Sequence, residues 1–169
     1  MNLEMSLLGW LHSLLSVMAL ASGLANILMP KGTSLHRRIG QIYVISLIAV
    51  CVTSLGVYSL HKFWFPHWTA LITLFLIAVA WSAARFKWPR RGWKYIHLTA
   101  VLVSYYMLIG GGVNEAFLRV DALHRLGGPS AESVLASPAL GLTHFAVMGV
   151  FVLLIASYLT VTAVSGKLR

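Results

Sequence analysis

Five stretches of about 20 mostly apolar residues run through the chain, and they limit its fold more than any other feature. They cover residues 5–29, 40–60, 68–84, 93–113 and 140–164. A helix needs roughly 20 apolar residues to cross a hydrocarbon core about 30 Å thick. The pattern therefore predicts an all-α polytopic membrane protein, a five-transmembrane-helix bundle that forms a single integral domain over residues 1–169.

The composition excludes an ordinary water-soluble globule. Apolar residues make up 59% of the chain and charged residues 10%, whereas soluble domains carry about 25% charged residues. There are 13 Lys and Arg against 4 Asp and Glu, which gives a net charge of +9. Because apolar runs interrupt the basic residues throughout, this charge favours anionic membrane lipids as partners and not nucleic acid.

The basic residues also predict the orientation of the helices. Ten of them fall in the first connection, the third connection and the C-terminal tail. Only Lys62, Arg119 and Arg125 fall on the opposite side. The positive-inside rule then puts the N-terminus outside and the C-terminus inside. Residues 119–137 form the one long outer connection, and their glycines and prolines indicate a surface loop.

Histidines lie on four of the five expected helices. His12 and His144 fall at similar depths on the outer side, where His67 and Glu115 also lie, whereas His36 and His97 fall on the inner side. Ionisable groups inside membrane spans are costly and usually functional, so these residues are the candidate site residues. The simplest alternative is that the imidazoles form hydrogen bonds between helices, as small and polar residues do in membrane bundles.

Neutral imidazole binds haem iron and first-row metal ions, so the sequence allows two alternative sites on the outer side. One is a haem b held by His12 and His144, with Gly110, Gly111 and Gly112 giving the porphyrin room. The other is a Zn, Cu or Fe ion held by His12, His67, His144 and Glu115. Glu115 has a second explanation, because Arg119 lies four residues later and can pair with it.

The inner side offers two weaker sites. His36 and His97 are the residues for a second haem or metal centre. Lys31, His36, Arg37 and Arg38 form a basic turn suited to a lipid phosphate or another anion, although such charges also set topology alone.

Several of these residues carry a resemblance to a known family. Leu11–His12, Gly23, Lys31–Gly32, His36–Arg37–Arg38, Gly40 and Tyr43 resemble the signature of a family of small bacterial polytopic membrane proteins that is catalogued as a domain of unknown function. His97 with Ser104–Tyr105 is similar to a later part of that pattern. The resemblance implies a helical membrane fold and a role for His12, His36 and His97. It implies no activity.

These observations predict a protein of the bacterial inner membrane that binds haem b through intramembrane histidines. It would pass electrons between a membrane quinol and a redox partner protein. Two alternatives stay open at this point. One is a metal-dependent membrane enzyme, and the other is a transporter or accessory subunit whose histidines only bridge helices.

Overall fold

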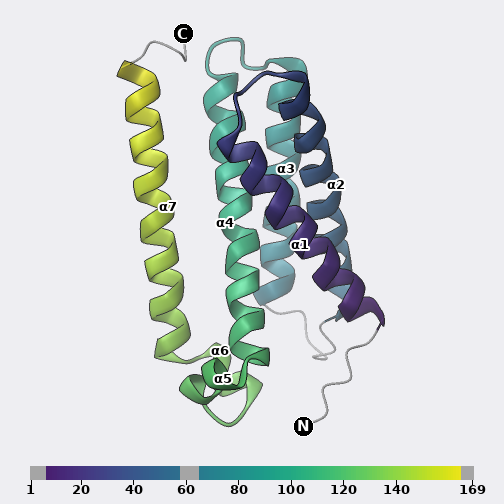
Figure 1. Cartoon of the computed structure of the whole chain (residues 1–169), viewed down its shortest axis with the longest axis vertical. Helices are drawn as coiled ribbons and strands as arrows, with labels where there is room; N and C mark the ends of the chain where they lie inside the picture. The colour runs from purple at the N-terminus through teal and green to yellow at the C-terminus, as the bar shows by residue number, and fades with distance from the viewer. Residues whose placement is uncertain (1–6, 58–64, 165–169) are drawn as a thin grey trace. The chain divides into compact units, whose positions relative to one another are not determined.

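The computed structural model describes residues 7–57 and 65–164, and within these ranges the chain is helical with no strand (Figure 1). The long helices are α1 (Leu7–Leu28), α2 (Ser34–Val57), α3 (Phe65–Phe86), α4 (Trp93–Arg119) and α7 (Pro138–Val164). Five helices of the described ranges are long and apolar enough to cross a membrane. The all-α prediction with five such helices is confirmed, and the orientation of the helices stays a prediction.

The chain forms two compact units, residues 1–79 and residues 80–169. The boundary between them lies inside α3. The first unit holds α1, α2 and most of α3, and the second holds the end of α3 and all later helices. The single domain expected over residues 1–169 stays a prediction.

In the first unit, α1 packs against α2 through small and polar residues. Ala19, Gly23 and Asn26 are buried on α1, and they belong to one helical face. The Asn26 side chain lies against Gly40 of α2, where an added Cβ would come within 3.2 Å of Asn26 Nδ2. The close approach at Gly40 shows how small residues bring these two helices together.

Side chains of the turn between α1 and α2 form capping hydrogen bonds with both helices. Lys31 Nζ donates hydrogen bonds to the carbonyl oxygens of Asn26 (2.9 Å) and Ile27 at the end of α1. At the start of α2, the backbone N–H of His36 donates to Thr33 Oγ1 at 3.0 Å. This is the bond that an N-cap threonine makes, so α2 begins at Ser34 and not near residue 40 as expected.

In the second unit, α4 continues to Arg119, although the apolar run predicted its end near residue 113. The expected outer loop over residues 119–137 is largely helical: it contains α5 (Asp121–Gly127) and α6 (Ala131–Leu135), which lie beside the lower ends of α4 and α7 in Figure 1. Phe117, Val134 and Leu140 form a small buried core among these four helices. The expectation of a surface loop was therefore wrong, because this segment buries apolar side chains of its own.

The bounds of the remaining helices differ from the expected ones by a few residues. Helix α3 runs over Phe65–Phe86, against the expected 68–84. Helix α7 begins at Pro138, two residues before the expected start, and Ser137 Oγ accepts the backbone N–H of Leu140 at 3.2 Å. The expected ends at residues 5 and 60 lie outside the described residues.

Candidate functional site

Three of the candidate histidines make a hydrogen bond from one ring nitrogen to an oxygen atom of another helix. They are His12 of α1, His97 of α4 and His144 of α7. Each of these bonds lies within one of the two compact units. An imidazole held in this way has a fixed ring orientation and a fixed position for one proton.

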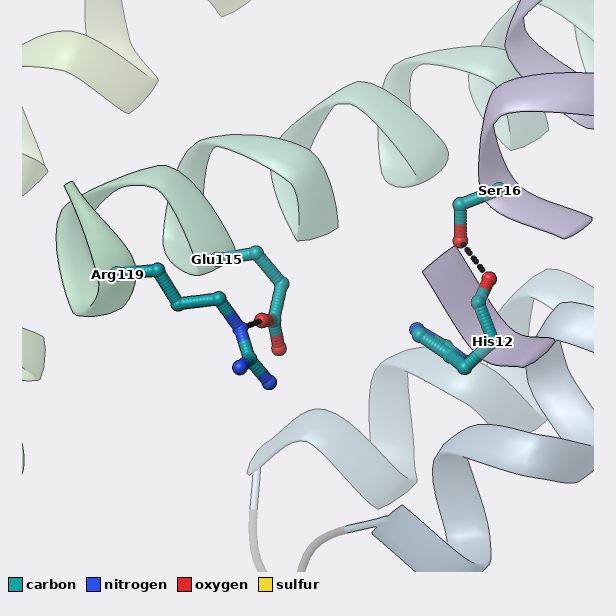
Figure 2. A network of polar contacts seen from close by, with 4 residues as sticks. All are labelled: His12, Ser16, Glu115 and Arg119. Carbon is teal, nitrogen blue, oxygen red and sulfur yellow. Dashed lines mark hydrogen bonds and ion pairs between the residues drawn. The ribbon is translucent and has the colours of Figure 1, made fainter. Parts of the chain in front are cut away.

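His12 is joined to α2. Its Nδ1 lies 2.9 Å from Thr53 Oγ1, and the Thr53 hydroxyl donates to the carbonyl oxygen of Ala49 at 2.7 Å. Because that hydroxyl proton is used, Thr53 Oγ1 accepts the proton on His12 Nδ1. Figure 2 shows the Ser16 hydroxyl donating to the carbonyl oxygen of His12 itself, at 2.8 Å within α1.

His144 is joined to α4. Its Nε2 donates to Asn114 Oδ1 at 2.8 Å, which leaves Nδ1 as the basic nitrogen of the neutral ring. The same ring lies against Gly110, where an added Cβ would be 3.4 Å from Cε1 and 3.7 Å from Nδ1. An added Cβ at Gly111 or Gly112 would meet no atom within 4 Å. The glycine run therefore serves two purposes: Gly110 admits the imidazole, and the next two positions face open space.

His97 is joined to the end of α3. Its Nδ1 donates to the carbonyl oxygen of Ala80 at 2.9 Å, since a carbonyl can only accept. Nε2 is then the basic nitrogen of the neutral ring. Within the described residues, the ring of His97 makes no second hydrogen bond.

The other two histidines stand in the first turns of their helices. His36 is half-buried in the first turn of α2, and its backbone N–H is bonded to Thr33. His67 is in the first turn of α3 and is 8% exposed. Both belong to the first unit, whereas His97 and His144 belong to the second.

Glu115 pairs with Arg119 on the same helix. The Arg119 Nε donates to Glu115 Oε2, as Figure 2 shows, so the pairing expected from the four-residue spacing is confirmed. In the part of the chain that the structure describes, no three His, Cys, Asp or Glu side chains are grouped so that they could hold a metal ion. The four-ligand metal centre of His12, His67, His144 and Glu115 thus has no support from the structure.

The partners of the histidines were not all foreseeable from the sequence. Asn114 is a polar residue beside Glu115 near the end of an apolar run, and this is the signal that the sequence offers for it. Thr53 is one of several hydroxyl residues in apolar helices and gave no signal. The Ala80 partner is a backbone carbonyl, which no side chain marks.

The comparisons with known proteins add no relative. No protein-family model, no curated protein and no solved structure matches this chain. The resemblance to the family of small bacterial membrane proteins stays a prediction.

Proposed function

We propose that this chain is an integral protein of the bacterial inner membrane that binds haem b and transfers electrons. The observation that carries the proposal is the shared geometry of His12, His97 and His144, each oriented through one ring nitrogen by an oxygen of another helix. Histidines that bind metals almost always donate their other ring N–H to such an oxygen, which fixes the tautomer and raises the basicity of the ligating nitrogen.

Among the histidines that would hold the haem, His144 has the most structural support. The bond to Asn114 places the proton on Nε2 and the lone pair on Nδ1. Gly111 and Gly112, next to the glycine that the ring contacts, have open space where side chains would stand. Small side chains of this kind are what a planar porphyrin needs beside a helix.

His12 is proposed as the second histidine that would hold this haem, and His36 with His97 would form a weaker inner site. When bound, the haem iron would accept and release one electron at a time. The residues of this chain bind and orient: Asn114, Thr53 and the Ala80 carbonyl hold the rings, and Arg119 holds the Glu115 carboxylate. A membrane quinol and a redox partner protein are the proposed donor and acceptor.

The test is optical spectroscopy of the full chain, purified in detergent and supplied with haem. The proposal expects a Soret band that sharpens and shifts when dithionite is added. His144→Ala and His12→Ala should each lose most of that band, whereas His97→Ala should lose only the fraction that a second haem contributes. His124→Ala, on the short helix α5, is the matched control and should leave the spectrum unchanged. Absence of a dithionite-sensitive band from the wild-type protein would refute the proposal.

The same bonds favour a second candidate, a transporter or accessory subunit whose histidines hold helices together. All three bonds join one helix to another, and such bonds in membrane proteins contribute roughly 0.6 kcal/mol each. This candidate predicts no haem spectrum. It also predicts that Asn114→Ala and His144→Ala lower thermal stability by equal amounts, since each removes the same bond.

A further inference from the structure

The segment from Trp81 to Tyr95 combines positive charge with exposed aromatic rings. It joins α3 to α4 and lies within the second unit. Its sequence contains five basic residues and no acidic residue, namely Arg85, Lys87, Arg90, Arg91 and Lys94. The segment therefore attracts anions over its whole length.

The charged groups of this segment are exposed. Arg85, Lys87, Arg90 and Arg91 are all on the surface, and their charged heads form no ion pair or hydrogen bond within the described residues. Two cations elsewhere in the chain are by contrast engaged, since Lys31 bonds to the end of α1 and Arg119 to Glu115. The four exposed heads can thus bind a partner without breaking a contact inside the protein.

The aromatic rings of the segment are equally exposed. Trp88 is 74% exposed, Phe86 65% and Trp81 50%. Phe86 meets the edge of Trp81 at 6.0 Å between ring centroids, and the Arg85 guanidinium lies 5.9 Å from the Phe86 centroid. Large apolar rings beside cations are costly in water, but they suit the boundary between lipid head groups and acyl chains.

We propose that the Trp81–Tyr95 segment is a binding surface for anionic phospholipid, with Arg85, Lys87, Arg90 and Arg91 on the phosphates and Trp88 and Phe86 among the upper acyl chains. The charge of the segment is complementary to phosphate, and its rings match the depth just below the phosphates. An acidic protein would use the charges but leave these rings in water. The inference rests on the membrane insertion proposed above, and it is independent of haem.

The experiment measures lipid binding to the full chain by native mass spectrometry in detergent. Phosphatidylglycerol and phosphatidylcholine with the same acyl chains are the two probes, and we expect the first to bind at least tenfold more tightly. Each basic residue near an anionic surface strengthens binding about fivefold. The triple variant Arg85→Gln/Arg90→Gln/Arg91→Gln should therefore bind phosphatidylglycerol about a hundredfold more weakly and phosphatidylcholine unchanged.

The control removes the same number of charges elsewhere. The variant Lys62→Gln/Arg125→Gln/Lys167→Gln has the same net charge as the first variant and should keep the preference for phosphatidylglycerol. Equal weakening in both variants would show an effect of net charge alone and would overturn the proposal. A polyglutamate peptide that displaces the bound lipid at comparable concentration would also overturn it, because the surface would then be a general acidic-partner site.

A second measurement locates the lipid and does not depend on the charge variants. The fluorescence of Trp88 is obtained as the difference between the wild type and Trp88→Phe in vesicles. Brominated phosphatidylglycerol should quench this signal more than brominated phosphatidylcholine at the same mole fraction. Equal quenching by the two lipids would contradict the proposal. The haem spectrum of the same preparations is recorded separately, so failure of one proposal is not mistaken for failure of the other.

Discussion

Lys31 shows how one side chain can supply hydrogen bonds that the end of an apolar helix lacks. The last carbonyl groups of a helix have no partner within it, and the Lys31 ammonium supplies one to Asn26 and Ile27. The positive charge also opposes the negative end of the helix dipole. Partial burial of the ammonium against α1 lowers the pKa of Lys31 below its ordinary value.

Replacing Lys31 by methionine should lower the stability of the chain by about 0.5–1 kcal/mol near neutral pH, because the carbonyl groups lose their donor. The pH dependence has a definite sign. A lysine whose pKa is lower when folded binds fewer protons in the folded state, so the wild type gains stability as the pH rises toward about 10.4. Thermal unfolding in detergent should show that the stability of the wild type, relative to that of Lys31→Met, increases between pH 7 and 10. A constant difference would contradict this explanation.

Gly110 controls the position of the His144 ring. A leucine at this position would push the imidazole away from Asn114, because an added Cβ already comes within 3.4 Å of Cε1. We expect Gly110→Leu to cost about 1–3 kcal/mol and, in the haem-binding assay, to lose the band that depends on His144. Gly149→Leu on α7 is the control, since an added Cβ there meets nothing within 4 Å and Gly149 has no part in the proposed haem site. Equal effects of the two variants would show that the ring contact is unimportant.

At the scale of elements, residues 119–137 show where prediction from the sequence failed. Helices α5 and α6 have 7 and 5 residues, which is too short for a hydrophobic period to be recognised. Their stability comes from packing around Val134, which is fully buried. The residues next to it in the sequence give no pattern that would predict this burial. Gly127, Gly128 and Pro129 predicted a loop, but Gly127 is the last residue of α5, and Gly128 and Pro129 lie in the short turn between α5 and α6.

Gly128 should be the least replaceable residue of that turn. Its φ of 125° and ψ of −177° are accessible only to glycine, and an added Cβ would lie 2.6 Å from Ser133 Oγ. We expect Gly128→Ala to destabilise the segment by about 1–3 kcal/mol and to make it sensitive to protease, with cleavage mapped by mass spectrometry. Gly141→Ala, where an added Cβ meets nothing within 4 Å, should leave the cleavage rate unchanged. Resistance of Gly128→Ala would refute the importance of this turn.

The helix ends were predictable only where polar and apolar residues change abruptly. The apolar run that marks α2 begins at residue 40, later than the helix itself, because the basic residues His36, Arg37 and Arg38 occupy its first turns. The capping bond to Thr33 gives the true start, and a threonine three residues before His36 was the available signal. Among the candidate site residues, the sequence identified the imidazoles but not Thr53 or the Ala80 carbonyl, which depend on how helices pack.

At the scale of the whole molecule, the five long apolar helices could be predicted from the apolar runs of the sequence. The thickness of a bilayer sets the length of such a run at roughly 20 residues. Orientation depends on the distribution of charge between the two sides and needs its own experiment. Cys51 is buried and is the single cysteine of the chain, so a Cys51→Ser variant has no thiol, and a cysteine introduced elsewhere is then the single site of labelling.

In that background, we expect Arg125→Cys to react with a membrane-impermeant maleimide on intact cells, and Arg90→Cys to react only after the cells are opened. Both native side chains are exposed, so burial within the protein does not explain a difference. The expected contrast is tenfold or more in labelling rate, since the reagent is blocked by the bilayer. The reverse pattern would place the N-terminus inside.

The turn of Lys31 and Thr33 has a consequence for biosynthesis. Its side chains bond two carbonyl groups at the end of α1 and one N–H group at the start of α2, and these bonds need no later part of the sequence. On the membrane insertion proposed above, the pair is therefore equipped to enter the bilayer as a hairpin while the rest of the chain is still being translated. Loss of either cap should then delay the first insertion event and expose the nascent chain to quality-control proteases.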